Sequence, residues 1–162
     1  MLLVNKNKIL IYNKKKYKCS IGLNGLTNNK VEGDKKTPIG TYSLGELFVR
    51  TDRIKNLKTK YKFIPIKNYM AWSDDPNDLE YNQLIETKNY HKESLYRDDN
   101  IYNLILTINY NTNPVIPNKG SAIFLHVSTN DYKPTNGCIA INANDFIEIL
   151  ELIDINEKIN IS

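Results

Sequence analysis

The feature that most constrains this chain is a series of short β-branched and aromatic runs, most of them bounded by Asn, Gly, Lys or Pro. Runs of this length and composition are typical of strands. The segment Asn13-Lys14-Lys15 separates two of them and has the residue types of a hairpin turn. The expected strands cover residues 2–4, 8–13, 16–22, 41–49, 101–110, 121–127, 138–142 and 158–162.

One stretch near the end, NANDFIEILELID, has a helical repeat instead. Its Asn142 is suited to cap the helix N-terminus, and Asp145 three residues later completes a weak capping box. Its apolar residues follow the i, i+3, i+4, i+7 spacing of a single stripe: Phe146, Ile149, Leu150 and Ile153. We therefore expect a mainly β fold, a β-sandwich or barrel-like sheet with one C-terminal helix packed on it.

The remaining pattern fits one domain. With 162 residues, of which 41% are hydrophobic and 25% charged, the chain has the size and composition of a single globular domain over residues 1–162. Residues 50–100 have the weakest periodicity and many turn dipeptides. We expect long loops with short elements there, lying over a face of the sheet.

The charge of the chain is mildly basic, with a net +4 and lysine clusters at 14–18 and 55–62. Such clusters are compatible with bound phosphates, with an anionic envelope polymer or with water alone. No ribonucleoprotein, zinc-finger or helix-turn-helix pattern accompanies them, so we expect no nucleic-acid partner.

Cysteine and histidine are scarce, with two of each. This number excludes a disulfide framework and a four-thiolate zinc site, and without a CxxC or HExxH pairing we expect no metal site. A single Cys19–Cys138 disulfide is compatible with the sequence, and it would prevent Cys138 from acting as a thiolate.

No targeting signal is visible at the start of the sequence. The N-terminal MLLVNKNKILIYNKKK has its apolar residues first and its lysines afterwards, the reverse of a secretory signal. No apolar run approaches the roughly 18 residues that span a bilayer. Either the chain acts where it is made, or a targeting segment is missing from the sequence.

Strand alternation places one histidine and one cysteine each on the strand face opposite an aliphatic face. In SAIFLHV it puts Ala122, Phe124 and His126 opposite an aliphatic face. In CIAIN it puts Cys138 and Ala140 opposite two isoleucines. Each aliphatic face belongs in the core, so His126 and Cys138 lie on the other side, among mostly small residues.

This arrangement has a catalytic and a structural interpretation. A cysteine nucleophile needs a nearby base and amide donors for an oxyanion, and Gly137 is suited to present such donors. Alternatively, Cys138 is a small core residue and His126 a partly buried one with satisfied hydrogen bonds.

The stretch SAIFLHV…PTNGCIAI resembles the catalytic segment of the YkuD-type L,D-transpeptidases, which have a histidine on one strand and then a Ser/Thr-x-Gly-Cys turn. EGDKKTPIGTYSL resembles the TPxG(T/R)(F/Y/W) segment of the same family. The stretches WSDDP, EYN and HKESLYRDDNIYN resemble a branch with the ending GC(I/V)A. Two positions depart from many members: Asn136 stands where they have His, and Ala140 where they have Arg.

The resemblance implies that Cys138 is the nucleophile and His126 its base, oriented by a backbone carbonyl near Val127 or Ser128. The amides of Gly137 and Cys138 would form the oxyanion hole. The substrate would be a peptidoglycan stem peptide cleaved at an L,D-peptide bond, with an amine as acceptor for transpeptidation or water for carboxypeptidation. No cofactor is implied, and we expect a monomer.

Other residues matching the branch are candidates for substrate binding. Arg97 is suited to bind a stem carboxylate, or it forms a structural ion pair with Glu93, Asp98 or Asp99. Trp72 is either a wall of the site or a buried anchor for a turn. The full set of candidates is Trp72, His91, Arg97, Tyr102, Thr135 and Asn136.

Two other functions are compatible with the sequence. One is a non-catalytic domain that binds an envelope glycopeptide through its lysines, and the other, motivated by charge alone, is nucleic-acid binding. For the enzyme we expect a periplasmic or cell-envelope location, although the visible sequence is also compatible with a cytoplasmic one.

Overall fold

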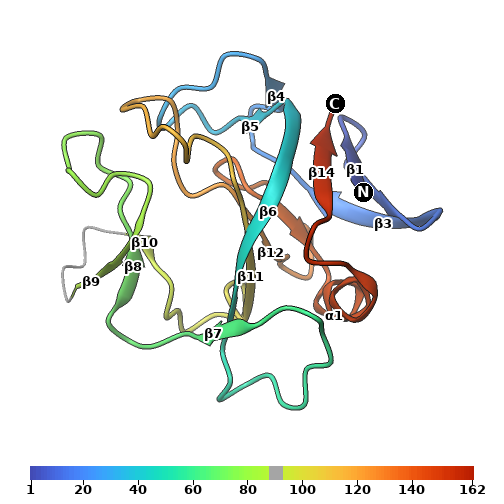
Figure 1. The fold of residues 1–162 in the computed structure, drawn as a ribbon. Helices are drawn as coiled ribbons and strands as arrows, with labels where there is room; N and C mark the ends of the chain where they lie inside the picture. The colour runs from blue at the N-terminus through green and yellow to red at the C-terminus, as the bar shows by residue number, and fades with distance from the viewer. Residues whose placement is uncertain (88–92) are drawn as a thin grey trace.

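The computed structural model describes residues 1–87 and 93–162, and its main sheet closes on itself. Its strand order is β11-β12-β13-β3-β2-β1-β14-β6-β7, and β6 also pairs with β11, which makes the sheet barrel-like (Figure 1). The strands of this sheet are β1 (Leu2–Asn5), β2 (Ile9–Tyr12), β3 (Lys15–Ser20), β6 (Gly40–Val49), β7 (Phe63–Pro65), β11 (Leu104–Ile108), β12 (Phe124–Val127), β13 (Ile139–Ile141) and β14 (Lys158–Ile161).

Local sequence accounts for the first hairpin. Asn13 and Lys14, between β2 and β3, have φ angles of 47° and 66°. Two successive positive φ values match the twist of a tight hairpin, and asparagine tolerates them better than most residues. The expected turn between residues 13 and 15 is confirmed.

The barrel interior is filled by the aliphatic faces of these strands. Ile123, Leu125, Val127, Ile139 and Ile141 all belong to this main core, as strand alternation predicts. Burying their side chains contributes roughly 1.5–3 kcal/mol each. The faces expected from the sequence for these two strands are therefore confirmed.

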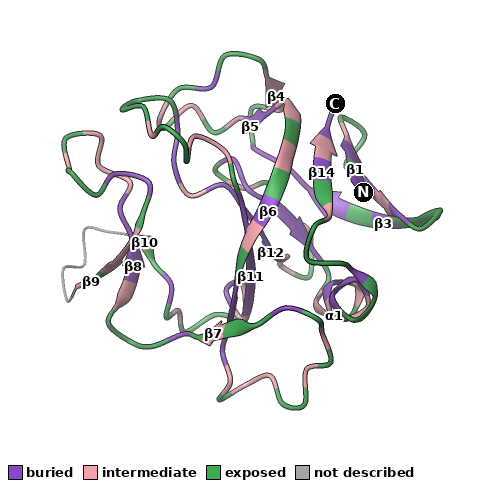
Figure 2. Ribbon diagram, viewed as in Figure 1, coloured by how far each residue is buried: buried purple, intermediate pink, exposed green. Residues whose placement is uncertain are grey.

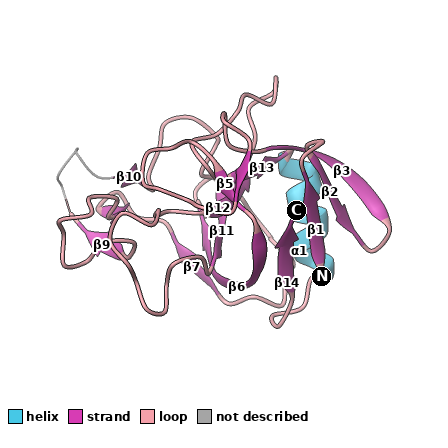
Figure 3. Cartoon of the chain, turned by 90° about the horizontal axis from the view of Figure 1, so that it is seen from above, coloured by secondary structure: helices cyan, strands magenta, loops and turns pink. Residues whose placement is uncertain are grey.

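The helix α1 (Ala143–Leu152) completes the core. Its stripe is fully buried, and Asn142 caps its N-terminus by accepting a hydrogen bond from Asn144 N–H at 2.9 Å. Its Glu148 carboxylate accepts from Lys15 Nζ and Tyr17 Oη, and so fixes the helix against β3. Figures 1 and 3 both show α1 on the side of the molecule that carries the two termini.

Ile54, Leu57 and Tyr61 pack with the main core, whereas residues 66–87 and 93–103 lie over the outer face of the barrel wall. They contain a small sheet of order β10-β8-β9, from β8 (Met70–Trp72), β9 (Leu84–Glu86) and β10 (Glu93–Ser94). This small sheet lies well away from α1 (Figure 1). Its Trp72 and the nearby Leu95 pack with Phe48, Ile105 and Phe124 of the barrel into a second buried cluster. Figure 2 colours part of β8 as buried. The expected loops with short elements over one sheet face are confirmed for residues 66–87 and 93–100, whereas residues 50–65 pack with the main core or join the main sheet as β7.

Two short strands, β4 (Leu26–Thr27) and β5 (Thr37–Pro38), pair in parallel at the ends of a polar loop. Buried Thr37 accepts a hydrogen bond from Gly22 N–H at 2.8 Å through its hydroxyl. No helix in the described part of the chain is long and apolar enough to cross a membrane.

Candidate active site

His126 lies in the middle of β12, with Ile105 of β11 and Ala140 of β13 as its neighbours across the sheet. Its Nδ1 is 2.8 Å from the carbonyl oxygen of Val127. A carbonyl only accepts hydrogen bonds, so Nδ1 carries the proton and Nε2 carries a lone pair. Burial lowers the pKa of His126 to about 4, against an opposing effect of the Val127 hydrogen bond. The imidazole is therefore neutral at pH 7.

Cys138 immediately precedes β13, two residues before Ala140, the partner of His126 across the sheet. In a strand, residues two apart share a face, so Cys138 is a diagonal neighbour of His126. Its thiol donates to the carbonyl oxygen of Ala122 at 3.1 Å. Burial raises the pKa of Cys138 to about 12, although a backbone hydrogen bond from Phe124 acts in the opposite direction. The resting thiol is thus protonated.

The two cysteines are not bonded to each other. Cys19 lies in the main core of the barrel, whereas Cys138 belongs to the second cluster on the outer face of the wall. The alternative of a Cys19–Cys138 disulfide is wrong for this structure, because the sheet separates the two side chains.

The turn before Cys138 is held by Thr135. Its Oγ1 donates to the carbonyl oxygen of Cys138 at 2.6 Å and accepts from Gly137 N–H at 3.1 Å. Gly137 has a φ of 142°, and a Cβ there would lie 3.0 Å from the carbonyl oxygen of Lys36. The expectation that Gly137 N–H is an oxyanion donor therefore needs correction, because Thr135 already binds this amide.

Cys138 and His126 line the same cavity, which has a volume of about 490 Å³. The turn contributes Thr135 and Asn136 to its wall, and Ala140 stands beside His126. Charged side chains lie around the cavity: Glu32, Lys35, Asp74, Glu93, Arg97 and Lys133. The structure thus brings together five predicted site residues of the turn and strands around one cavity: His126, Val127, Thr135, Asn136 and Cys138.

Arg97 also lines this cavity, but its guanidinium is already paired. It binds both oxygens of Asp99, at 2.9 Å and 2.7 Å, and lies 3.7 Å from a Glu93 oxygen. Tyr102 donates to the same Glu93 oxygen at 3.0 Å, and its ring meets that of His126 edge-on with centroids 5.3 Å apart. The structural ion pair is therefore observed, and Tyr102 supports the imidazole.

Trp72 is placed differently from a substrate-binding wall. Trp72 is buried in the second cluster, where Nε1 donates to Asn82 Oδ1 at 3.0 Å and the ring meets Phe124 edge-on. It does not line the cavity of Cys138. Its burial and contacts fit the alternative of a buried anchor, and a role in substrate binding stays a prediction. His91 lies outside the described residues. Ser128 N–H pairs with Ile141 O, while Val127 provides the carbonyl to the imidazole.

The sequence did not predict the hydrogen bond that holds the backbone of Ala122. This residue has a φ of 50°, and its N–H donates to Asn82 Oδ1 at 3.0 Å. Asn82 is buried and also donates to the carbonyl oxygens of Tyr110 and Asn111. The EYN motif contains Asn82, but strand and helix periodicity carry no information on such a contact.

No cluster of three or more His, Cys, Asp or Glu side chains suited to a metal ion occurs among residues 1–87 and 93–162.

Comparison with known proteins agrees with this geometry. The family model YkuD, the L,D-transpeptidase catalytic domain, matches residues 1–161. A search of curated proteins finds no significant match.

Two solved structures resemble the chain. One is the crystal structure of the helical cell shape determining protein Pgp2 from Campylobacter jejuni, with 17% identity and a TM-score of 0.49 over 99% of this chain and 46% of that one. The other is an L,D-transpeptidase from Mycobacterium smegmatis, with 10% identity and a TM-score of 0.43 over 99% of this chain and 57% of that one. The chain thus spans about half the length of these proteins. Through the family model, which matches nearly its whole length, the chain belongs to the YkuD family of L,D-transpeptidase catalytic domains.

Proposed function

We propose that this chain is a cysteine acyltransferase that acts on peptidoglycan stem peptides as an L,D-transpeptidase. Family membership supports an enzyme that modifies peptidoglycan. The observation that carries the cysteine mechanism is the hydrogen bond from His126 Nδ1 to Val127 O, made beside a cavity that His126 shares with Cys138. It leaves Nε2 as the proton acceptor.

In the first step Cys138 gives its proton to His126 Nε2, and Sγ attacks the carbonyl carbon of the L-residue in an L,D-peptide bond. A C–S bond forms and the carbonyl oxygen becomes an oxyanion. We assign its stabilisation to the backbone N–H of Cys138, because Gly137 N–H is bound by Thr135. Collapse breaks the C–N bond, and the imidazolium proton passes to the leaving amine of the D-residue.

The second step resolves the thioester. An acceptor amine loses a proton to His126 and attacks the thioester carbonyl carbon. The new C–N bond is the peptide cross-link, the C–S bond breaks, and Cys138 leaves as a thiol with the proton from His126. If water replaces the amine, the product is a shortened stem peptide and the enzyme is an L,D-carboxypeptidase. Product analysis decides between these outcomes.

The resting site starts this cycle uncharged. The thiol is protonated and the imidazole neutral, since burial shifts the pKa values of both away from ionisation near pH 7. Substrate entry must therefore replace the hydrogen bond from the thiol to Ala122 O before the proton reaches His126. We infer that proton transfer accompanies the attack on the carbonyl.

Substrate selection is assigned to the other residues of the cavity. Arg97 and Asn136 lie on its wall, and Arg97 is suited to a bidentate carboxylate contact if a substrate displaces Asp99. Ala140 leaves open space where many family members carry an arginine. For such substrates we expect a single domain acting in the periplasm or cell envelope.

The test is acylation by a carbapenem, measured as a mass shift of the intact protein. We expect one equivalent on the wild type and on Cys19→Ala, and none on Cys138→Ala. A shift that survives in Cys138→Ala, or no shift in a wild type whose Cys138 reacts with iodoacetamide, contradicts the proposed nucleophile.

A further inference from the structure

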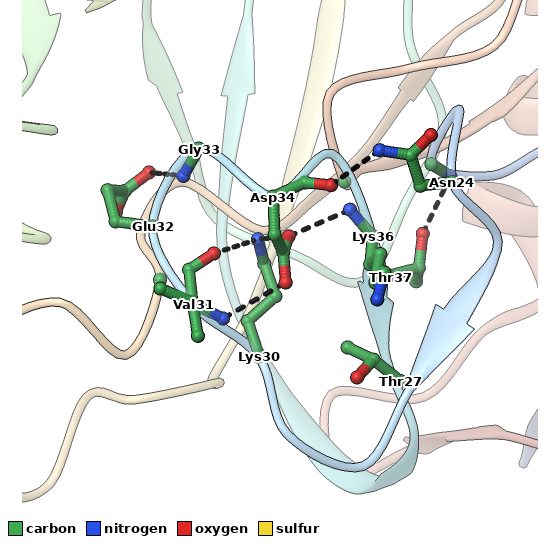
Figure 4. A network of polar contacts seen from close by, with 12 residues as sticks. Asn24, Thr27, Lys30, Val31, Glu32, Gly33, Asp34, Lys36 and Thr37 are labelled. Carbon is green, nitrogen blue, oxygen red and sulfur yellow. Dashed lines mark hydrogen bonds and ion pairs between the residues drawn. The ribbon is translucent and has the colours of Figure 1, made fainter.

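Lys30 is a buried cation in the loop between β4 and β5, with only 3% of its side chain exposed. Its Nζ donates to Asp34 Oδ1 at 2.5 Å and to the carbonyl oxygen of Val31 at 3.1 Å (Figure 4). Burying an ammonium is unfavourable unless it is paired and hydrogen-bonded, and lysine normally keeps its charge in water. The buried ammonium of Lys30 is therefore expected to be compensated by contacts within the fold.

The partner of Lys30 is held as firmly as Lys30 itself. Asp34 accepts hydrogen bonds from the backbone N–H groups of Val31 at 3.0 Å and Lys36 at 2.8 Å (Figure 4). Burial acts to raise the pKa of Asp34, but Lys30 and the two amides outweigh it, so the pKa lies below its ordinary value. The carboxylate is ionised at pH 7, and the loop contains a fixed ion pair.

The stem of Lys30 packs between two glycines that flank the reacting sulfur. A Cβ on Gly120 would lie 2.8 Å from Lys30 Cγ, and one on Gly137 would lie 3.7 Å from Lys30 Cε. Gly120 leads into Ala122, whose carbonyl accepts from the thiol, and Gly137 precedes Cys138 itself. Lys30 therefore contacts both segments that fix the thiol.

Glu32 attaches the same loop to the segment that carries Ala122. One of its carboxylate oxygens accepts from Ser121 Oγ at 2.7 Å and from the hydroxyl of Tyr81. The Tyr81 hydroxyl in turn accepts from Gly120 N–H at 3.1 Å. The loop thus reaches the wall of the cavity by hydrogen bonds as well as by packing.

We propose that Lys30 is a positioning residue for Cys138: its stem spaces the Ala122 and Cys138 segments, and its ammonium supplies fixed positive charge to the developing thiolate. This inference deepens the proposed function and rests on Cys138 as the nucleophile. The charge of Lys30 acts to lower the pKa of Cys138, against the larger effect of burial. Asp34 holds the ammonium in place, and its negative charge opposes part of that effect.

The other groups around the sulfur do not replace Lys30. Glu93 acts to raise the pKa of Cys138, Tyr102 is a neutral phenol, and His126 is a neutral imidazole. The remaining charged side chains on the cavity wall are Glu32, Lys35, Asp74, Arg97 and Lys133. All of these groups stay unchanged in the variants below, so a difference between variants reports the Lys30–Asp34 pair.

The test measures the rate of iodoacetamide alkylation of Cys138 against pH, by peptide mapping, in four proteins. They are the wild type, Lys30→Met, Asp34→Asn and the double variant. Well below the thiol pKa the rate is proportional to the thiolate fraction, so we read the shift of the rate–pH profile there. We expect the profile to shift up by about one pH unit in Lys30→Met, a tenfold lower rate at a given pH, and down by about one unit in Asp34→Asn, with the double variant between Lys30→Met and the wild type.

Opposite shifts are the decisive feature, because both single variants lose the same ion pair. A purely structural pair gives shifts in one direction for both variants, or none, and either result overturns the inference. Cys19, buried in the barrel interior, stays unreactive while the barrel is intact and so reports loss of fold in the same sample. If Lys30→Met opens the barrel, Asp34→Asn still tests the inference by comparison with the wild type. If the alkylation profile of Cys138 does not shift down in Asp34→Asn, the inference is overturned.

This readout is independent of peptidoglycan. If the shifts occur and purified muropeptides are not processed, the Lys30 inference stands and the proposed function fails. If muropeptides are processed and the rate–pH profiles do not shift, the proposed function stands and the Lys30 inference fails.

Discussion

His126 Nδ1 lies 2.8 Å from the carbonyl oxygen of the next residue in its own strand, Val127. A histidine that is oriented by its neighbour's backbone needs no acidic side chain to fix its tautomer. Burial keeps the imidazole neutral against the opposing effect of this hydrogen bond, which has consequences for stability as well as for catalysis.

The first prediction concerns pH and stability. The pKa of His126 is about 4 in the fold and near 6.5 when unfolded, so the unfolded chain takes up the proton first. Stability should therefore fall as the pH drops from about 6.5 to about 4, by at most roughly 3 kcal/mol from this group. Urea unfolding of the wild type and His126→Gln across this range measures it. The difference in unfolding free energy between the two should shrink towards acid pH, and a constant difference contradicts the buried neutral imidazole.

The second prediction concerns Thr135. Its hydroxyl serves both Gly137 N–H and Cys138 O, so Thr135→Val leaves two backbone groups without that partner. We expect a loss of about 1–3 kcal/mol in unfolding free energy and slower acylation of Cys138. Thr135→Ser keeps the hydroxyl and should stay near the wild type in both measurements. Equal behaviour of the two variants would show that the hydroxyl does not hold the turn.

The third prediction compares two glycines with positive φ. Gly137→Ala places a Cβ 3.0 Å from Lys36 O, whereas a Cβ on Gly25 meets nothing within 4 Å. Both variants suffer backbone strain of about 1 kcal/mol, but only Gly137→Ala also displaces the turn of the nucleophile. Carbapenem acylation should slow at least tenfold in Gly137→Ala and remain unchanged in Gly25→Ala. Comparable rates in the two variants contradict the proposed constraint.

The fourth prediction tests Arg97 as a substrate-binding residue. Arg97→Gln removes the guanidinium, while Asp99→Asn keeps it and weakens its present ion pair. If Arg97 binds a stem carboxylate, KM for a tetrapeptide substrate should rise about tenfold in Arg97→Gln and not in Asp99→Asn. The kcat values should stay similar. A rise in KM in both variants would instead assign Arg97 to the support of Tyr102 and Glu93.

The sequence predicts which strand faces line the site, but not the hydrogen bonds that hold the site residues in place. Alternation around Phe124 and His126 requires only that one strand face is aliphatic, so it correctly separates the main core from the cavity. The position of Val127 O follows from the resemblance to the YkuD family. Within that motif, the order of Thr135 and Cys138 in the chain does not reveal that Thr135 occupies Gly137 N–H, because this contact depends on the turn conformation.

Other features depend on tertiary contacts with no periodic signal. Ala122 has a positive φ and donates its N–H to buried Asn82, and the two residues are far apart in sequence. Lys30 stands among other polar residues and reads as a solvated side chain, yet it is buried between Gly120 and Gly137. Trp72 has the residue type of a binding wall, but packing against Phe124 places it in the interior.

The central claim is that Cys138 and His126 carry out acyl transfer at an L,D-peptide bond. The most direct measurement is mass analysis of the products formed from a purified disaccharide tetrapeptide by the wild type, Cys138→Ala and His126→Ala. We expect the wild type to release the terminal D-amino acid and to form a cross-linked dimer, with a tripeptide instead of the dimer if water is the acceptor. Cys138→Ala should form neither product, and His126→Ala should be at least a hundredfold slower. Product formation by Cys138→Ala at the wild-type rate would contradict the account.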